Sequence, residues 1–164
     1  MNKHKTQQGF GVVKVLVSIP LVLIGLVILV FTYTELNKAY WDYRVKELCE
    51  EDGGVTVFET VVLTKEEHEN LSAYISTRKS TTKVNGYFFE SDTEIIREKS
   101  PVVRRYVSHL YRSSDKKILA SRVGYSRRGG DIPTGISHPS GFSCTQLVGI
   151  NNDIIGSIFI IKEE

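Results

Sequence analysis

Cysteine is scarce in this sequence, and its two copies are poorly spaced for metal binding. The 164 residues include only Cys49 and Cys144. Structural zinc sites usually contain a close pair of cysteines, separated by about two to four residues, which is absent here. A looser set, formed by both cysteines with Asp131 and His138, lacks that spacing. We therefore predict no metal site.

The usual motifs of catalysis are missing as well. The sequence has no phosphate-binding loop, no dinucleotide-binding glycine motif and no paired-carboxylate pattern. Ser140 lacks the G-x-S-x-G turn of serine hydrolases. A Cys–His nucleophile pair would need Cys144 as a free thiolate with a lowered pKa. We predict that the chain is not an enzyme and takes no cofactor.

Charge is absent from Val15 to Tyr33, a run of 19 residues that are mostly valine, leucine and isoleucine. A helix over this run spans roughly 28 Å, close to the ~30 Å hydrocarbon core of a bilayer. The run is longer than a typical signal peptide's apolar region, and no small-residue cleavage site follows it. Cys49 lies too far downstream for a lipoprotein. We predict a retained transmembrane helix over residues 12–33.

The N-terminal flank of this helix is purely basic. Residues 1–14 carry three lysines and no acid, whereas both signs are mixed after the helix. The positive-inside rule then predicts a cytoplasmic tip at residues 1–11 and a periplasmic domain at residues 34–164, anchored in an inner membrane. Because the chain after residue 14 has one more acid than base, its charge does not indicate nucleic-acid binding.

Export affects what the two cysteines can do. In an oxidising compartment, Cys49 and Cys144 can form a disulfide that closes a loop of 95 residues. The loop-entropy model gives such a bridge about 4 kcal/mol of stabilisation. The alternative is a pair of buried free thiols. We predict the disulfide on the basis of the topology.

The apolar helix is predicted to continue into an amphipathic helix over residues 35–52. Gly53-Gly54 should end it, since glycine accepts the left-handed conformation of a helix cap. One strip of this helix is apolar at helical spacing. It comprises Trp41, Val45, Leu48 and Cys49.

Downstream, the pattern changes to strands. Val55–Leu63 alternates with a period of two, and Thr64 with Glu67 has the spacing of a capping box, which should open a helix to about Tyr74. A helical turn is expected within residues 91–100, and a long loop over Gly129–Gly141. Further strands are expected over residues 83–90 (alternatively a hairpin around Asn85-Gly86), 102–112, 117–128 and 153–162. The strands at 102–112 and 117–128 should form a hairpin, and the last should be a central strand. The fold class is therefore α+β, with a mostly antiparallel sheet.

Charge is unevenly distributed over the predicted domain. Residues 35–70 contain ten acids and four bases, whereas residues 97–128 contain ten bases and two acids. One interpretation is that these segments are solvated faces that partly neutralise each other. The other is a basic hairpin that binds lipid headgroups, an anionic envelope polymer or an acidic partner protein. Its candidate residues are Arg104, Arg105, Arg112, Arg122, Arg127 and Arg128, with Tyr106 and Tyr111.

Two stretches, LCEEDGGVTVFETV and RRGGDIPTGISHPSGFSC, resemble a family of small uncharacterised proteobacterial envelope proteins. The resemblance implies that the two cysteines belong together, and it supplies no activity. We expect the second stretch to form a structured loop in which Asp131 and His138 hydrogen-bond to the backbone. The matching positions are Cys49, Asp52, Gly53, Gly54, Gly129, Gly130, Asp131, His138, Pro139, Ser140, Phe142 and Cys144.

The N-terminus, KTQQGF followed by the apolar run, resembles type IV prepilins and pseudopilins. In that family a basic leader ends in glycine, phenylalanine follows, and a long helix runs from the membrane into a β-rich head. Lys14 stands where most members carry glutamate, and Gly11 where threonine is usual. The resemblance implies cleavage after Gly9 and assembly as a minor subunit.

Two functions follow from these patterns. The first is a single-pass inner-membrane protein whose periplasmic domain acts by binding or assembly, with the lipid bilayer and an envelope protein or anionic envelope component as partners. The alternative is the minor pilin-like subunit.

Overall fold

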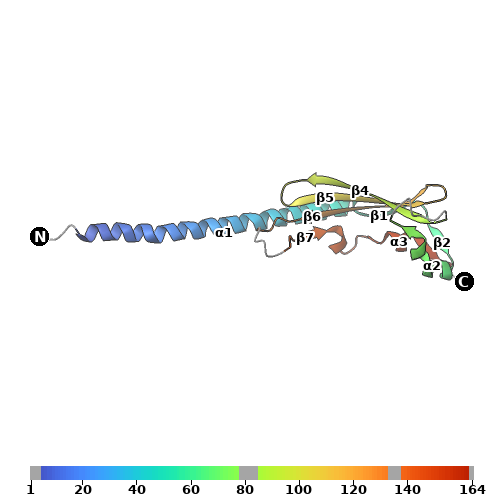
Figure 1. Ribbon diagram of the computed structural model, residues 1–164, viewed down its shortest axis with the longest axis horizontal. Coiled ribbons are helices and arrows are strands. Elements are labelled where there is room, and N and C mark those ends of the chain that lie inside the picture. The colour runs from blue at the N-terminus through green and yellow to red at the C-terminus, as the bar shows by residue number, and fades with distance from the viewer. Residues whose placement is uncertain (1–4, 78–84, 133–137, 163–164) are drawn as a thin grey trace.

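The computed structural model describes residues 5–77, 85–132 and 138–162. A single helix, α1 (Lys5–Asp52), extends far beyond a β-rich domain (Figure 1). It passes Pro20 without a break, and its side chains from Val17 to Tyr33 are all exposed. The described part of α1 has the length and apolar composition needed to cross a membrane. This finding confirms the predicted long apolar helix.

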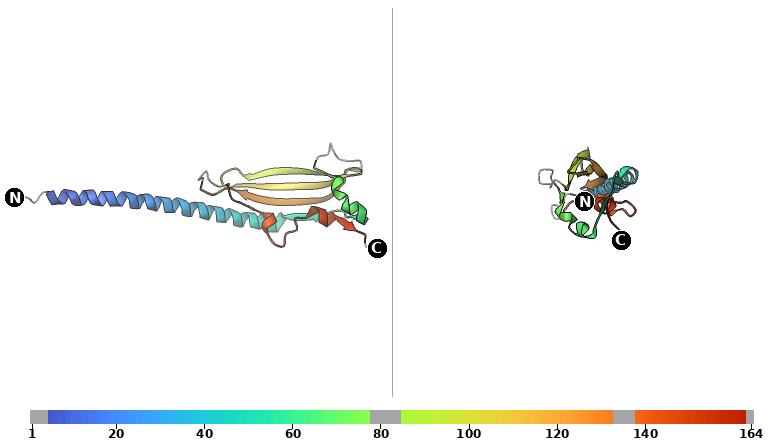
Figure 2. Two further views of the ribbon diagram at one scale, coloured as in Figure 1. Left: turned by 60° about the horizontal axis from the view of Figure 1, so that its bottom comes forward. Right: turned by 90° about the vertical axis from the view of Figure 1, so that its right-hand side faces the viewer.

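The main sheet packs against the C-terminal half of α1. Its strand order is β1-β6-β5-β4-β3, and β7 pairs with β6. An antiparallel meander runs roughly along the axis of α1 (Figure 2); its strands are β4 (Tyr87–Arg97), β5 (Val102–Arg112) and β6 (Ile118–Arg128). The shorter strands are β1 (Gly54–Val57), β3 (Ile75–Ser76) and β7 (Gly141–Ser143), of which β3 alone pairs in parallel.

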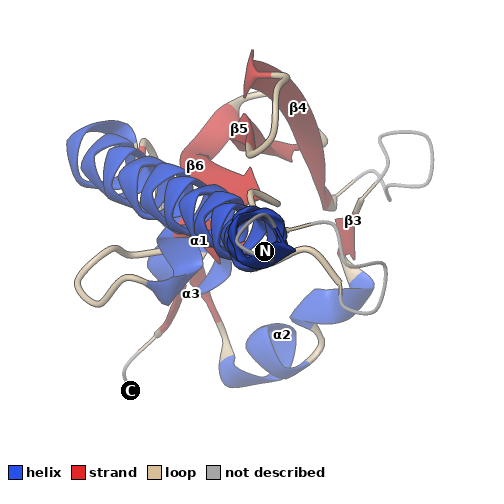
Figure 3. Ribbon diagram, turned by 90° about the vertical axis from the view of Figure 1, so that its left-hand side faces the viewer, coloured by secondary structure: helices blue, strands red, loops and turns tan. Residues whose placement is uncertain are grey.

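A second, two-stranded parallel sheet and the short helices complete the domain. The two strands are β2 (Val61–Leu63) and β8 (Phe159–Ile161). Viewed along α1, the helices α2 and α3 lie on the opposite side from β4 and β5 (Figure 3). The helices are α2 (Lys65–Glu69) and α3 (Ile154–Ile158), with 3-10 turns η1 (Leu71–Ala73) and η3 (Cys144–Gln146).

Several local predictions are confirmed. Thr64 and Glu67 form both hydrogen bonds of a capping box at the start of α2. α1 ends at Asp52, and Gly54 follows with a φ of +112°. The hairpin of β5 and β6 is present as predicted, with its second strand beginning one residue later, at Ile118. The sheet is mostly antiparallel, so the α+β class is correct.

Three predicted elements were wrong. Residues 91–97 continue β4 instead of forming a helical turn, because they pair with β5. Val55–Leu63 is not one strand but two, β1 and β2, which belong to different sheets. The apolar stretch 153–162 is not a central strand: Asp153 caps α3, and only three residues continue as β8. Of the expected strand at 83–90, residues 83–84 lie outside the described part of the chain.

Two buried clusters hold the domain together. The cluster beneath α1 contains the predicted strip of the helix, and within it Cys49 and Cys144 form the predicted disulfide, with 5.4 Å between their Cα atoms. The disulfide thereby joins α1 covalently to η3, which directly follows β7 of the main sheet. The second cluster lies around α3 and the second sheet, and its buried members are Leu71, Leu110, Leu119, Ala120, Ile154, Ile158 and Phe159.

Candidate functional site

Strand alternation separates the six arginines of the predicted basic hairpin onto two faces of the sheet. Successive side chains of a strand point to opposite faces, and cross-strand partners share a face. Arg105 pairs with Tyr125, and Arg127 with Val103, on the face that α1 covers. The remaining four arginines, Arg104, Arg112, Arg122 and Arg128, fall on the opposite face.

Arg127 and Arg105 connect the sheet to α1. The Arg127 side chain is only 3% exposed, and its Nε and Nη2 donate to the carboxylate of Asp42 on α1. Arg105 Nη2 donates to Oδ2 of Asp52 at 3.2 Å. Both guanidinium groups are engaged within the fold, as the neutralising interpretation expects.

Arg112 is engaged in the same way at the far end of the hairpin. Its guanidinium forms ion pairs with Glu59 and, at 2.9 Å, with Asp115. Hydrogen bonds from Lys117 and Arg112 lower the pKa of Glu59. Three of the six predicted arginines therefore have acidic partners inside the domain.

The other three arginines lie on this opposite face of the sheet, which we call the basic face. Its end near Leu110 and Ala120 is covered by the second cluster, whereas its end near Arg104 and Arg128 is open. Arg104 and Arg128 line a groove of about 510 Å³ together with Tyr106 and Ser126. A methyl group added at Gly124, which pairs with Tyr106, would meet no atom within 4 Å, so nothing in the described structure covers this point. The other lining residues are Arg127, Pro139, Gly141, Phe142, Ser143 and Gln146.

The basic face carries no carboxylate on its three long strands. The acids of β4 are Glu90, Asp92 and Glu94, and their positions alternate onto the other face. Arg122 Nη1 donates to the carbonyl of Asn152 at 3.3 Å. Within the described residues, Arg104 and Arg128 form no ion pair. The strands thus concentrate uncompensated positive charge beside a groove.

The loop after β6 is structured where it is described. Asp131 Oδ2 accepts from the backbone N of Ser140 at 2.6 Å, and its Oδ1 accepts from the Ser140 hydroxyl at 2.8 Å. These hydrogen bonds, with a smaller effect of Lys38, lower the pKa of Asp131. Gly129 and Gly130 adopt positive φ angles of 82° and 93°. His138 and Pro139 are exposed, and residues 133–137 lie outside the described part.

The cysteines and histidines offer no other site in the described residues. No group of three or more His, Cys, Asp or Glu is arranged there to hold a metal ion. Cys144 is not available as a thiolate because it is bonded to Cys49.

Sequence patterns indicated the arginines and Tyr106 of the groove, but not its small and polar residues. Ser126 and Gly124 lie two and four positions before Arg128, on the same face of β6. A period of two, counted from Arg128, would have found them. Ser143 belongs to β7 and Gln146 to η3. Both elements reach the groove through the pairing of β7 with β6.

Comparison with family models, with curated proteins and with solved structures found no match for this chain. The basic face and α1 are therefore the features from which a function can be inferred.

Proposed function

We propose that this chain is a single-pass inner-membrane protein whose periplasmic domain binds an anionic component of the bacterial envelope through the basic face. The observation that carries the proposal is the pair of uncompensated arginines, Arg104 and Arg128, at one groove. Anchoring is supported by the bare apolar half of α1. The disulfide and the Asp42–Arg127 pair then fix the domain to the same helix.

The orientation of the sheet favours a ligand in the periplasm over lipid headgroups. The long strands run roughly along α1, so a helix that crosses the bilayer holds the face of the sheet upright on the membrane (Figure 2). A flat bilayer then meets the end of the sheet near Arg104 and Arg128 edge-on, and the groove beside these arginines opens sideways, into the periplasm. The ligand we infer carries carboxylate or phosphate groups, because guanidinium groups bind both as charge-assisted, bidentate partners.

The groove also contains neutral polar groups that suit a hydroxyl-rich anion. The hydroxyl of Ser126 donates to that of Tyr106 at 3.2 Å, which leaves both oxygens at the surface of the groove. Ser143, the cross-strand partner of Ser126, and Gln146 supply further hydrogen-bonding groups to the groove. An acidic polysaccharide offers both kinds of partner along one chain, and we expect it to bind better than a polymer of phosphate alone.

The test uses the full chain in nanodiscs of zwitterionic lipid. Polygalacturonate, polyphosphate and neutral dextran are titrated against the wild type and against the double variant Arg104→Gln/Arg128→Gln. Loss of two charge-assisted contacts should weaken polygalacturonate binding by at least about tenfold. The matched control is Lys46→Gln/Lys65→Gln, which removes the same charge from exposed positions on α1 and α2 and should leave the affinity within about twofold.

Salt provides the second arm of this test. Binding should weaken steeply between roughly 50 and 300 mM salt, because the distance over which exposed charges are screened falls from about 14 Å to about 6 Å over this range. Binding that salt does not weaken would overturn the proposal. An equal loss in the control variant, or no binding of either polyanion, would do the same.

A second candidate, the pilin-like subunit, is favoured by a different observation. α1 is continuous from Lys5 to Asp52, with residues 17–33 exposed and the C-terminal half packed on a mostly antiparallel sheet, as the prepilin resemblance implies. The two candidates differ in the N-terminus of the protein isolated from membranes. Sequencing should give Met1 for a plain anchor and Phe10 for a processed subunit.

A further inference from the structure

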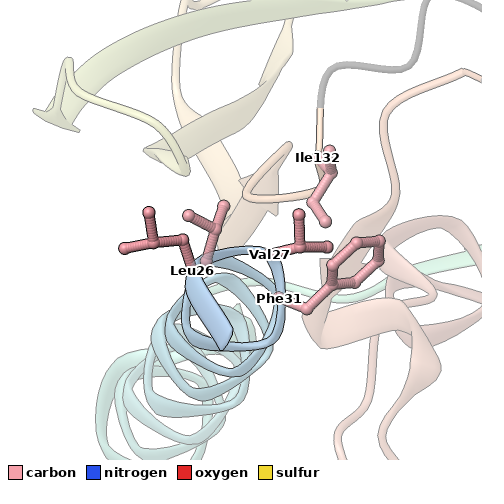
Figure 4. Close-up of a pocket in the computed structure, with 5 residues that line it drawn as sticks. Leu26, Val27, Phe31 and Ile132 are labelled. Atoms are coloured by element: carbon pink, nitrogen blue, oxygen red, sulfur yellow. The ribbon is translucent and has the colours of Figure 1, made fainter. Parts of the chain in front are cut away.

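An apolar groove lies where the loop after β6 reaches α1. Its volume is about 290 Å³. Figure 4 shows Ile132 directed toward the helix, opposite Leu26, Val27 and Phe31. With Val30, these residues line the groove, and all five side chains are hydrocarbon only.

The residues before Ile132 hold it beside the helix. The Asp131 carboxylate, already bonded to Ser140, lies 3.5 Å from the Lys38 ammonium group of α1. One residue earlier, the backbone N of Gly130 donates to the Ser100 hydroxyl at 3.2 Å. The loop is therefore fixed on both the helix side and the sheet side immediately before Ile132.

The loop and the helix change from polar to apolar at the same level. Asp131 lies beside Lys38, which belongs to the charged part of α1, whereas Ile132 lies beside residues 26–31 of the uncharged part. Leu26 is seven residues before Tyr33, the last residue of the predicted transmembrane helix, and therefore lies about 10 Å below it along the helix. The headgroup region on each side of a bilayer is about 5–7 Å thick, so a side chain at the level of Leu26 would lie below the headgroups.

We propose that Ile132 enters the outer leaflet as a second membrane contact, and that a lipid acyl chain fills the groove between it and α1. This inference rests on the proposed membrane anchoring. The groove is continuous with the helix surface that the membrane would cover, and the four helix residues that line it are more than half exposed in the isolated chain. A polar occupant has no hydrogen-bonding side chain to meet there, whereas an acyl chain needs none.

The chain offers a convenient optical test, because it contains one tryptophan, Trp41. The variant Ile132→Trp is reconstituted as the full chain in vesicles, and its fluorescence is compared with that of the wild type, which gives the Trp41 background. We expect lipids brominated on their acyl chains to quench the added tryptophan, and aqueous iodide to quench it at least about threefold less than a fully exposed one. The matched control is Val148→Trp, which replaces a fully exposed residue in the loop after η3 and should show the reverse preference.

Failure of the inference is distinguishable from failure of the anchor. Extraction of the vesicles with alkaline carbonate first shows whether the wild type is integral; release at that step overturns the anchoring proposal. If the protein is retained but iodide quenches the tryptophan of Ile132→Trp as strongly as that of Val148→Trp, the loop contact is overturned and the anchor stands. A third outcome is that neither quencher reaches the tryptophan of Ile132→Trp, and that this protection is lost when the protein is diluted in lipid. That outcome would indicate a second copy of the chain in the groove, and it would also overturn the proposal.

A covalent readout covers the case in which the bulky side chain disturbs the loop. A benzophenone amino acid introduced in place of Ile132 should form a photoadduct with lipid, detected as the protein mass plus one lipid. The same group in place of Val148 should give no lipid adduct. Absence of lipid adducts at position 132, with the disulfide intact, would contradict insertion.

Discussion

The phenolic hydroxyl of Tyr125 donates a 2.7 Å hydrogen bond to Oδ2 of Asp52 and accepts one of 3.1 Å from Nε of Arg105. Asp52 is the last residue of α1, whereas Tyr125 and Arg105 lie on neighbouring strands. The three groups therefore connect the end of the helix to the sheet. The hydrogen bond from Tyr125, with a further contribution from Arg105, lowers the pKa of Asp52.

This lowered pKa gives a pH-dependent prediction for Asp52→Asn. A carboxyl whose pKa is lower in the folded state stabilises the fold above its unfolded pKa of about 3.9, and the contribution is lost as the pH falls through the folded pKa. The variant should therefore be less stable than the wild type at pH 7, and the difference should shrink toward zero near pH 2. Denaturant unfolding of the detergent-solubilised full chain at both pH values measures it. The control Asp92→Asn, at an exposed position on β4, should show no such convergence.

The disulfide gives a prediction of magnitude. The double variant Cys49→Ala/Cys144→Ala removes a cross-link that closes 95 residues, and the loop-entropy model predicts a loss of about 4–5 kcal/mol in the free energy of unfolding. Denaturant titration of the full chain, with and without reductant, provides the measurement. Reductant should lower the free energy of unfolding of the wild type toward that of the variant, and should leave that of the variant unchanged. A wild type that is insensitive to reductant under unfolding conditions would contradict the prediction.

Local patterns in the sequence predicted the elements whose cause is local. The capping box of Thr64 and Glu67 and the glycine end of α1 depend on residues within one helical turn. The β5–β6 hairpin has a period of two and a polar turn. The second half of β4 was missed because residues 90–96 are exposed, so neither face carries the apolar pattern of a strand. Its structure comes from hydrogen bonds to β5, which the sequence does not display.

The candidate site was predictable only in part, for a similar reason. Composition indicates an excess of arginine between residues 97 and 128, but not which arginines find acids. Asp42 and Arg127 are 85 positions apart, and Glu59 and Arg112 are 53 apart. Pairings over such distances depend on the strand register and on the side of the sheet that α1 covers. The register therefore separates structural arginines from those of the basic face.

Adjacent arginines on β6 allow this separation to be tested. Arg127→Met leaves the carboxylate of Asp42 and the carbonyl of Gly129 without the buried guanidinium, and we expect a loss of about 2 kcal/mol in the free energy of unfolding. Arg128→Met, one position along and exposed, should change stability by less than about 0.5 kcal/mol. Thermal or denaturant unfolding of the full chain compares the two. Equal losses would show that the Asp42–Arg127 pair does not support the contact between helix and sheet.

Gly130, in the loop that carries Ile132, has the same backbone conformation as Gly149, which lies after η3. Substitutions at the two positions therefore separate the cost of backbone strain from the cost of packing. Gly130 and Gly149 both have a φ of +93°, a conformation in which an L-alanine costs about 1–2 kcal/mol. A Cβ at Gly149 would meet nothing within 4 Å, whereas one at Gly130 would lie 3.2 Å from Cβ of Pro101. Gly149→Ala should therefore cost the backbone strain alone. Gly130→Ala should cost about 1 kcal/mol more, because Pro101 is buried and cannot move away freely. Denaturant unfolding of both variants gives the difference, and losses that agree within error would mean that the loop yields at Gly130 and does not hold Ile132 in a fixed position.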